Sequence, residues 1–91
     1  MSFNESTLAR AVGLSVSQLN RLFLRQFGLS SRGYFDRRRY QHALTVLEES
    51  TRVVKEIASD LGFSSLPHFS AWFRRKHGVS PREFRTGRSG L

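Results

Sequence analysis

Apolar residues recur with the spacing of an α-helix through the middle of the chain, at residues 31–49. Tyr40, Ala43, Leu44 and Leu47 follow an i, i+3, i+4, i+7 pattern, which places them on one face of a helix. Arginine and other polar residues lie largely off this face. The pattern therefore predicts one long amphipathic helix.

The segments on either side of this helix carry two versions of the same pattern. The first contains LARAVGLSVSQLNRLF from Leu8, and the second contains IASDLGFSSLPHFSAWF from Ile57. The matched pairs include Ala9 with Ala58, Gly13 with Gly62, Leu19 with Phe69, Phe23 with Phe73, Gly28 with Gly78 and Tyr34 with Phe84. Two copies are too few for a solenoid, which needs at least about three repeats. We therefore interpret the chain as two related helical units joined by the central helix.

Each unit has the signals of a short helix, a glycine turn and a longer helix. In the first unit, Gly13 ends the short helix, and Ser15 with Gln18 forms a capping box for the next one. In the second unit, Gly62 and Ser65 take the same places. Helix, turn and helix make a helix-turn-helix unit. The sequence thus predicts an all-α fold with two homeodomain-like helix-turn-helix subdomains and a long central helix between them.

The predicted organisation has four segments along the chain. Gly28 ends the longer helix of the first unit, and Ser30 caps the central helix. Ser80 and Glu83 cap a last short helix that runs through Phe84. The four segments are a first helix-turn-helix unit at residues 4–30, a linker helix at 31–49, a second helix-turn-helix unit at 50–86 and a frayed tail at 87–91.

The chain is strongly basic and has no cysteine. Lys and Arg number 15 against 7 Asp and Glu, which gives a net charge of +8 and a sequence pI of about 11.5. This balance is typical either of a solvated basic surface or of a protein with a polyanionic partner such as nucleic acid. Without cysteine there is no disulfide framework and no cysteine zinc site. The N-terminus lacks the features of a signal peptide, and no stretch approaches a membrane span. We therefore expect a cytoplasmic protein with no metal, no cofactor and no membrane partner.

The outer face of the longer helix in the first unit indicates the partner. Helical spacing predicts that Ser17, Asn20, Arg21, Leu24 and Arg25 face outward, while Leu19, Leu22, Phe23 and Phe27 face the core. Asn and Arg in the first turns of a recognition helix pair with adenine and guanine edges in the major groove. A solvated face usually mixes Glu with Lys, whereas this face has no acidic residue. Leu24 fits neither interpretation well, because it adds apolar surface where a basic residue would help.

The matching helix of the second unit has fewer side chains that could recognise a base. Its predicted core residues are Phe69, Trp72 and Phe73, and its predicted outer residues are Pro67, Ser70, Ala71, Arg74 and Arg75. Ala71 stands where Arg21 stands in the first unit, and it offers only apolar contact, for example to a thymine methyl. We therefore expect the first unit to carry most of the sequence discrimination. The second unit is expected mainly to position the domain through contacts to the DNA backbone.

The chain resembles the DNA-binding domain of AraC/XylS-type transcription regulators, in which a long helix joins two helix-turn-helix units. The resemblance covers about residues 4 to 85. It rests on the first-unit motif quoted above, on the spacer residues Arg39, Ala43 and Leu47, and most specifically on EIASDLGFSSLPHFSAWFRRKHGVSPREFR. It implies base contacts from Ser17, Asn20 and Arg21 in the first unit, and from Leu66, Pro67, His68, Ser70 and Ala71 in the second. It places Arg25, Arg74 and Arg75 near phosphates, and we expect further backbone contacts from Arg37, Arg38 and Lys76.

The expected function is sequence-specific binding of double-stranded promoter DNA, as the DNA-binding domain of an AraC-type regulator. A spacer of roughly 17 residues extends about 25 Å at the α-helical rise. This is somewhat short of the ~34 Å between major grooves on one face of DNA. Offsets of the two units, or a bend in the duplex, could close the difference. We expect the two recognition helices of one molecule to occupy successive major grooves.

Two departures from the family pattern concern the extent of the chain. The family commonly has a further helix before the first unit, and it usually carries a ligand-sensing or dimerising domain. A chain of 91 residues that begins where this one does holds neither. The chain is therefore expected to be either a fragment of a longer regulator or a stand-alone monomeric binder, and the missing first helix favours a fragment. We expect the domain itself to be monomeric.

Other functional classes have less support in the sequence. An enzyme is not indicated, because the three histidines are scattered and no phosphate loop, nucleophile elbow or metal pair appears. An RNA-binding module would be expected to place aromatics on a sheet, whereas these aromatics follow helical core spacing. A protein-interaction module, for example one that contacts RNA polymerase, stays open. Binding that weakens steeply with salt would distinguish DNA from a protein partner.

Overall fold

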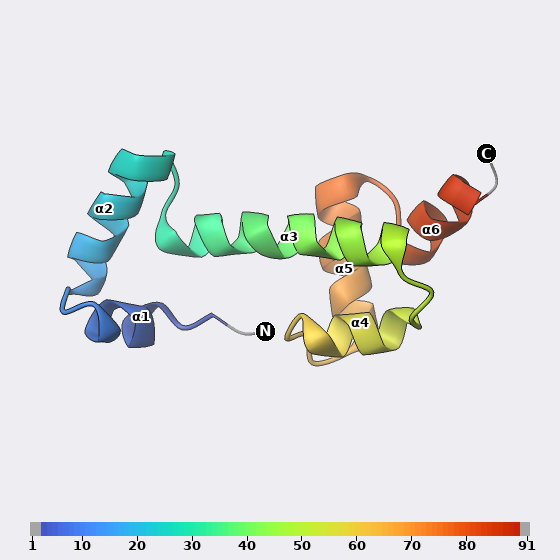
Figure 1. The fold of residues 1–91 in the computed structure, drawn as a ribbon, viewed down its shortest axis with the longest axis horizontal. Helices are drawn as coiled ribbons and strands as arrows, with labels where there is room; N and C mark the ends of the chain where they lie inside the picture. Colours follow the sequence, from blue (N-terminus) through green and yellow to red (C-terminus); the bar gives the residue numbers. More distant parts are fainter. Residues whose placement is uncertain (1–2, 90–91) are drawn as a thin grey trace. The chain divides into compact units, whose positions relative to one another are not determined.

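The computed structural model describes residues 3–89, together with the side chains of all of these except residues 88 and 89. The described chain is entirely helical, without a strand, which confirms the predicted fold class (Figure 1). It divides into two compact units between Arg38 and Arg39, within the longest helix. We call them the N-terminal unit, up to Arg38, and the C-terminal unit, from Arg39. The helices are α1 (Glu5–Ala11), α2 (Val16–Phe27), α3 (Ser31–Glu49), α4 (Val54–Asp60), α5 (Leu66–His77) and α6 (Pro81–Ser89).

The helices begin where side chains accept hydrogen bonds from otherwise unpaired backbone N–H groups. Asn4 Oδ1 accepts from Thr7 N at 2.9 Å and starts α1. Ser15 Oγ accepts from Gln18 N at 3.1 Å, and Gln18 Oε1 accepts from Ser15 N at 2.9 Å. This exchange is the predicted capping box, and it fixes the start of α2. At α5, Ser65 Oγ accepts from His68 N at 3.2 Å and starts the helix.

The two glycine turns have the same geometry, which confirms the internal repeat at the level of local structure. Gly13 and Gly62 follow α1 and α4 with φ of 74° and 89°, a left-handed conformation that a side chain would strain. In both turns the next residue donates its N–H back into the helix. Leu14 N donates to Ala9 O at 2.9 Å, and Phe63 N donates to the carbonyl of Ala58 at 3.0 Å. Each turn therefore directs the chain into the following helix along the same path.

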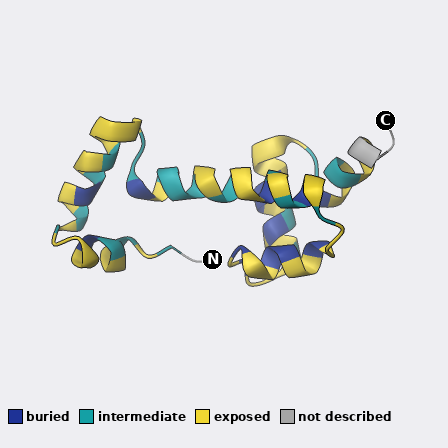
Figure 2. Cartoon of the chain, in the orientation of Figure 1, coloured by how far each residue is buried: buried dark blue, intermediate teal, exposed yellow. Residues whose placement is uncertain are grey.

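The C-terminal unit has a conventional apolar core. Helix α5 contributes Phe69 and Phe73, both at 0 % exposure, and Trp72 beside them, as predicted. Figure 2 shows buried positions gathered on α4 and α5. The rest of the core comes from Ala43, Leu47, Val54, Ile57, Ala58, Leu61 and Phe63. The guanidinium carbon of Arg39 lies 4.3 Å from the centre of the Phe63 ring and 5.0 Å from that of Trp72. This basic side chain therefore covers the core by cation–π contact.

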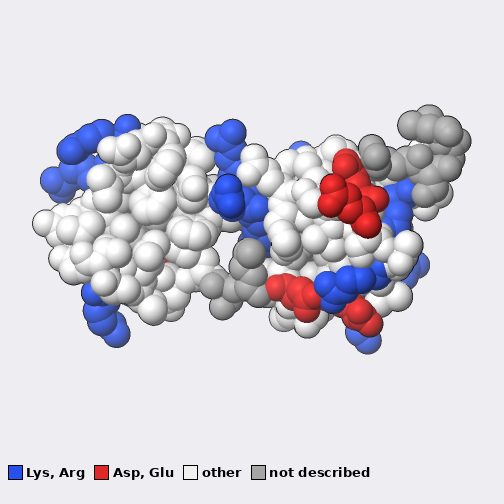
Figure 3. Space-filling model, in the orientation of Figure 1, with Lys and Arg blue, Asp and Glu red and all other residues white. Residues whose placement is uncertain are grey.

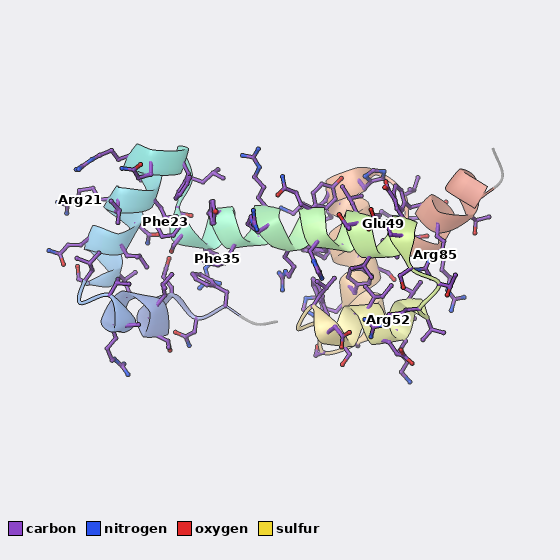
Figure 4. The ribbon with its side chains drawn as sticks, viewed as in Figure 1. Arg21, Phe23, Phe35, Glu49, Arg52 and Arg85 are labelled. Atoms are coloured by element: carbon purple, nitrogen blue, oxygen red, sulfur yellow. The ribbon has the colours of Figure 1, made fainter. Side chains whose placement is uncertain are left out.

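Helix α6 closes the C-terminal unit through one arginine. The Arg85 guanidinium donates to three backbone carbonyls, those of Leu47 at 3.2 Å, Ser50 at 3.1 Å and Arg52 at 2.6 Å. These carbonyls lie at the end of α3 and just beyond it, where a helix leaves acceptors without intrahelical partners. Figure 4 labels Arg85 near Glu49 and Arg52. No pattern in the sequence predicted this clamp. The last helix was predicted to run through Phe84, whereas α6 continues to Ser89.

The N-terminal unit is held by a less buried core. Among its described apolar side chains only Ala9 and Leu19 are buried, each at 2 % exposure. Aromatic rings supply much of the remaining packing: Phe3 stacks on Phe35 at 4.5 Å between ring centres, Phe27 packs on Tyr34 at 4.5 Å, and Phe23 packs on Tyr34 at 5.3 Å. The prediction that Leu22 faces the core is wrong, because it is 42 % exposed. Phe27 packs on Tyr34 as described, but it still leaves 50 % of its surface exposed. Helix α1 and the part of α3 up to Arg38 do not fully cover the sides of α2 on which Leu22 and Phe27 lie.

Candidate nucleic-acid interface

The outer face of α2 is formed by Ser17, Arg21, Leu24 and Arg25, all of which are exposed. The first turn of α2 carries no acidic side chain, so no carboxylate opposes a polyanion there. Figure 4 shows Arg21 and Phe23 on opposite sides of the helix. On the visible face of the N-terminal unit, Figure 3 shows basic side chains and almost no acidic surface. The four residues therefore form one accessible surface, which we call the α2 face.

Asn20 does not belong to the α2 face, contrary to the sequence-based expectation that it contacts a base. Its Oδ1 accepts from Ser31 N at 2.8 Å and lies 2.8 Å from the Ser31 hydroxyl. Its Nδ2 donates to Glu5 Oε2 at 3.0 Å, and the Ser31 hydroxyl is also 2.8 Å from that oxygen. Bidentate recognition of adenine needs both the oxygen and the amide of an asparagine. Here both are engaged within the protein, so the expected outward orientation of Asn20 is wrong.

We call this set the Glu5–Asn20–Ser31 network. Ser31 is fully buried at 0 % exposure, and it is the first residue of α3. Hydrogen bonds from Ser31 and Asn20, together with the nearby Arg32 charge, hold the pKa of the Glu5 carboxyl below its ordinary value. The network ties the first turn of α1, the middle of α2 and the start of α3 together. It therefore fixes how α2 is presented to a partner.

The outer face of α5 carries less polar chemistry. Pro67, His68 and Ala71 are exposed, whereas Leu66 and Ser70 are half-buried. His68 is held near the turn, because its ring packs edge-on against Phe63 at 5.3 Å. Its Nδ1 lies 3.5 Å from Ser64 Oγ. The predicted base-contacting residues of the second unit therefore lie in the first half of α5, and only His68 and Ser70 bring polar atoms.

Basic residues continue along the last turns of α5. Arg74, Arg75 and Lys76 are exposed there. Arg74 Nη2 donates to Glu83 Oε1 at 2.6 Å, and this carboxylate also accepts from Ser80 N at 3.2 Å. Hydrogen bonds from Ser80 and the contact with Arg74 lower the pKa of Glu83. The Arg74 side chain is still 59 % exposed, so the ion pair leaves part of it open to a phosphate.

The other residues predicted to contact the DNA backbone lie on two different helices. Arg25 is exposed in the last turn of α2, and Arg37 and Arg38 are exposed on the N-terminal unit's part of α3. Arg39 differs from them because it is half-buried against the core rings described above. Arg25 therefore belongs to the α2 face, whereas Arg37 and Arg38 lie on α3.

Two further features bear on function. No group of three or more His, Asp or Glu side chains that could hold a metal ion occurs within residues 3–89. None of the described helices is both long and apolar enough to cross a bilayer.

The chain contains two pairs of helices, each joined by a turn with a glycine, and the second helix of each pair has an exposed face. This arrangement defines it as a helix-turn-helix protein. The model of a helix-turn-helix domain family matches residues 8–87. The transcriptional activator RhaS of Escherichia coli (strain SE11) is 39% identical over 88 residues, which are 97% of this chain and 32% of that protein. The chain thus spans about a third of the length of the curated relatives it matches.

Solved structures agree on the family. An AraC-type transcriptional regulator from Chromobacterium violaceum superimposes with a TM-score of 0.82 at 33% identity, over 96% of this chain and 78% of that one. The DNA-binding domain of the global transcriptional factor AdpA, solved in complex with a target DNA, gives a TM-score of 0.89 at 29% identity. The match covers 98% of this chain and 80% of that one. The chain belongs to the AraC-type helix-turn-helix family of transcription-regulator DNA-binding domains.

Proposed function

We propose that this chain binds double-stranded DNA in a sequence-specific manner, with α2 and α5 as recognition helices in the major groove. The observation that carries the proposal is the α2 face, an exposed helix surface with Arg21 at its centre and no acidic residue in α2 itself. An arginine in this position can donate two hydrogen bonds to guanine. The net charge of +8 supplies the attraction to phosphates that any such complex needs.

The proposed base contacts are divided unequally between the two units. In the N-terminal unit they come from Ser17 and Arg21, while Asn20 supports them from behind. In the C-terminal unit they come from Pro67, His68, Ser70 and Ala71. The proposed contacts to the DNA backbone come from Arg25, Arg37, Arg38, Arg74, Arg75 and Lys76. The N-terminal unit therefore has the stronger hydrogen-bonding chemistry for base recognition.

We propose that one molecule occupies two successive major-groove segments on one face of the duplex. Helix α3 has 19 residues, and at the α-helical rise it extends about 28 Å, which is short of the ~34 Å between such segments, so the proposal includes a bend in the duplex or an offset of the units. The domain is proposed to bind as a monomer in the cytoplasm, at the bacterial nucleoid, without catalytic chemistry. Hydroxyl-radical footprinting should show two protected segments per bound molecule. One segment of half that extent would contradict the proposal.

The main test is selection of bound sites from a random duplex pool, followed by titration in salt. The expected result is an enriched motif with two parts. If roughly five basic side chains reach phosphates, log K should fall against log salt with a slope of about −4 to −5. A pool without enrichment, together with binding that does not change with salt, would favour a protein partner such as RNA polymerase.

A further inference from the structure

Leu24 is 55 % exposed on the α2 face, between positions that the proposed function assigns to DNA. It follows Ser17 and Arg21 at the i, i+4, i+7 spacing, so the three side chains lie along one stripe of the helix. A single exposed leucine is common on protein surfaces and by itself indicates nothing. Its place within a recognition surface is what requires an explanation.

The fold does not require a leucine at this position. The matched residue of the C-terminal unit is Arg74, an exposed side chain that pairs with Glu83 at 2.6 Å. Gly33 stands in the N-terminal unit where Glu83 stands in the C-terminal unit, so no such carboxylate is available to position 24. The same place in the repeat thus accepts a charged, solvated side chain. Packing within the unit does not explain Leu24.

The inward orientation of Asn20 changes the chemistry that the α2 face offers. With both ends of that carboxamide engaged by Ser31 and Glu5, the face presents one guanidinium, one hydroxyl and one branched apolar side chain before Arg25. Guanidinium groups recognise guanine, and apolar side chains recognise the C5-methyl group of thymine in the major groove. We infer that Leu24 is a specificity-determining residue that contacts a thymine methyl beside the base pair recognised by Arg21.

The helix geometry sets the distance between the two recognised bases. Leu24 lies three residues after Arg21, which is about 4.5 Å along the helix axis. Successive base pairs are about 3.4 Å apart. The thymine is therefore expected within one or two base pairs of the position that Arg21 recognises. This inference rests on the proposed function, since it assumes that α2 occupies the major groove.

The test combines a single methyl group on the DNA with a single side chain on the protein. The site is first selected from a random duplex pool with the wild-type chain, and the base pair whose preference is relaxed in Arg21→Ala marks the position of α2. Each thymine within two base pairs is then replaced by deoxyuridine, which lacks only the 5-methyl group. For one of them the wild-type chain should lose about threefold to fivefold in affinity. Leu24→Ala should lose a similar factor on the thymine site and show no further loss on the deoxyuridine site.

Leu22→Ala is the matched control, because Leu22 is 42 % exposed on the same helix but off the α2 face. It should keep the full preference for thymine over deoxyuridine. Circular dichroism of each variant checks that the fold is retained. Several results would overturn the inference: no thymine near the marked base pair, an equal deoxyuridine penalty in wild type and Leu24→Ala, or a loss in Leu24→Ala that is uniform over all sites. Failure of the wild-type chain to bind any duplex would instead overturn the proposed function together with it.

Discussion

The two units place different chemistry at the same position of their repeat. The first residue of the third helix is fully buried in both units, as Ser31 in one and as Pro81 in the other. In the N-terminal unit, Ser31 is satisfied by hydrogen bonds with Asn20 and Glu5. In the C-terminal unit, the residues matched to Asn20 and Glu5 are Ser70 and Val54, and the buried proline lacks an N–H to satisfy. One backbone arrangement is thus supported by a polar network in one unit and by apolar packing in the other.

The difference extends to the whole core of each unit. The described C-terminal unit buries a cluster that includes Phe69, Trp72 and Phe73, whereas the N-terminal unit buries only Ala9 and Leu19 among its described apolar side chains. Burial of apolar surface is the main source of stability in a small domain. We therefore expect the C-terminal unit to be the more stable one. The unit that is proposed to carry most of the sequence discrimination would then be the more easily perturbed.

The largest expected effect comes from the matched pair Phe73 and Phe23. Phe73→Ala removes a fully buried ring and should destabilise the C-terminal unit by about 3–5 kcal/mol. Phe23→Ala removes a half-buried ring and should cost about 1–2 kcal/mol in the N-terminal unit. Urea unfolding followed by Trp72 fluorescence reports the C-terminal unit, and circular dichroism reports both units. Equal costs for the two variants would show that the cores do not differ in the way described.

Asn20→Ala should be the next most damaging change. It leaves the buried Ser31 N–H without its acceptor, although the Ser31 hydroxyl keeps Glu5, and this should cost about 1–3 kcal/mol. DNA affinity should fall by a similar factor on every site, because we propose that Asn20 supports α2 and does not recognise a base. Ser70→Ala is the matched control in the C-terminal unit and should change stability by no more than about 0.5 kcal/mol. A variant at Asn20 that folds normally and loses preference at one base pair would restore the base-contacting role.

Arg21 and Arg74 are expected to differ in what they contribute to DNA binding. Arg21→Ala should cost about 1–3 kcal/mol on the selected site and should relax the preference at one base pair. Arg74→Ala should weaken binding to selected and random DNA about equally, and by less, because this side chain is already paired with Glu83. Binding of both variants to the two kinds of DNA measures the difference. A change in base preference in Arg74→Ala would remove the distinction between the two helices.

The smallest expected effect is the pH dependence of the N-terminal unit. The pKa of Glu5 is lowered in the folded chain, so its ionised form stabilises this unit at a pH above its ordinary value of 4.5. That contribution should be lost as the pH falls below this value and through the lowered pKa. Hydrogen exchange measured separately for α1 and α2 should show the loss, and Glu5→Gln should make their protection less dependent on pH. A dependence unchanged in Glu5→Gln would exclude Glu5 as its source.

The sequence predicted the local structure well because helix starts and ends are encoded by neighbouring residues. The capping box of Ser15 and Gln18 and the turns at Gly13 and Gly62 involve residues only a few positions apart. The i, i+3, i+4, i+7 spacing in the central helix likewise placed Ala43 and Leu47 on the apolar face, and both are buried. These features follow from backbone hydrogen bonding and helical periodicity alone.

The remaining features depend on contacts between residues distant in the sequence. Asn20 lies at the edge of the predicted outer face, and its inward orientation depends on partners in α1 and α3 that helical periodicity does not place. The clamp formed by Arg85 reaches back to carbonyls at the end of α3 for the same reason. The exposure of Leu22 depends on which flanks of α2 its neighbours fail to cover. Such contacts are set by packing, which a single sequence does not specify position by position.

The most direct test of the unequal division between the units is a scan of single-base substitutions across the selected site. Wild-type affinity is measured for every substitution, and Arg21→Ala locates the part of the site beneath α2. We expect losses of about 1–3 kcal/mol for substitutions at the base pairs that α2 recognises. Losses beneath α5 should be clearly smaller, because Pro67 and Ala71 offer only apolar contact. Equal losses beneath both helices would contradict the unequal division and would mean that His68 or Ser70 discriminates bases as strongly as Arg21 does.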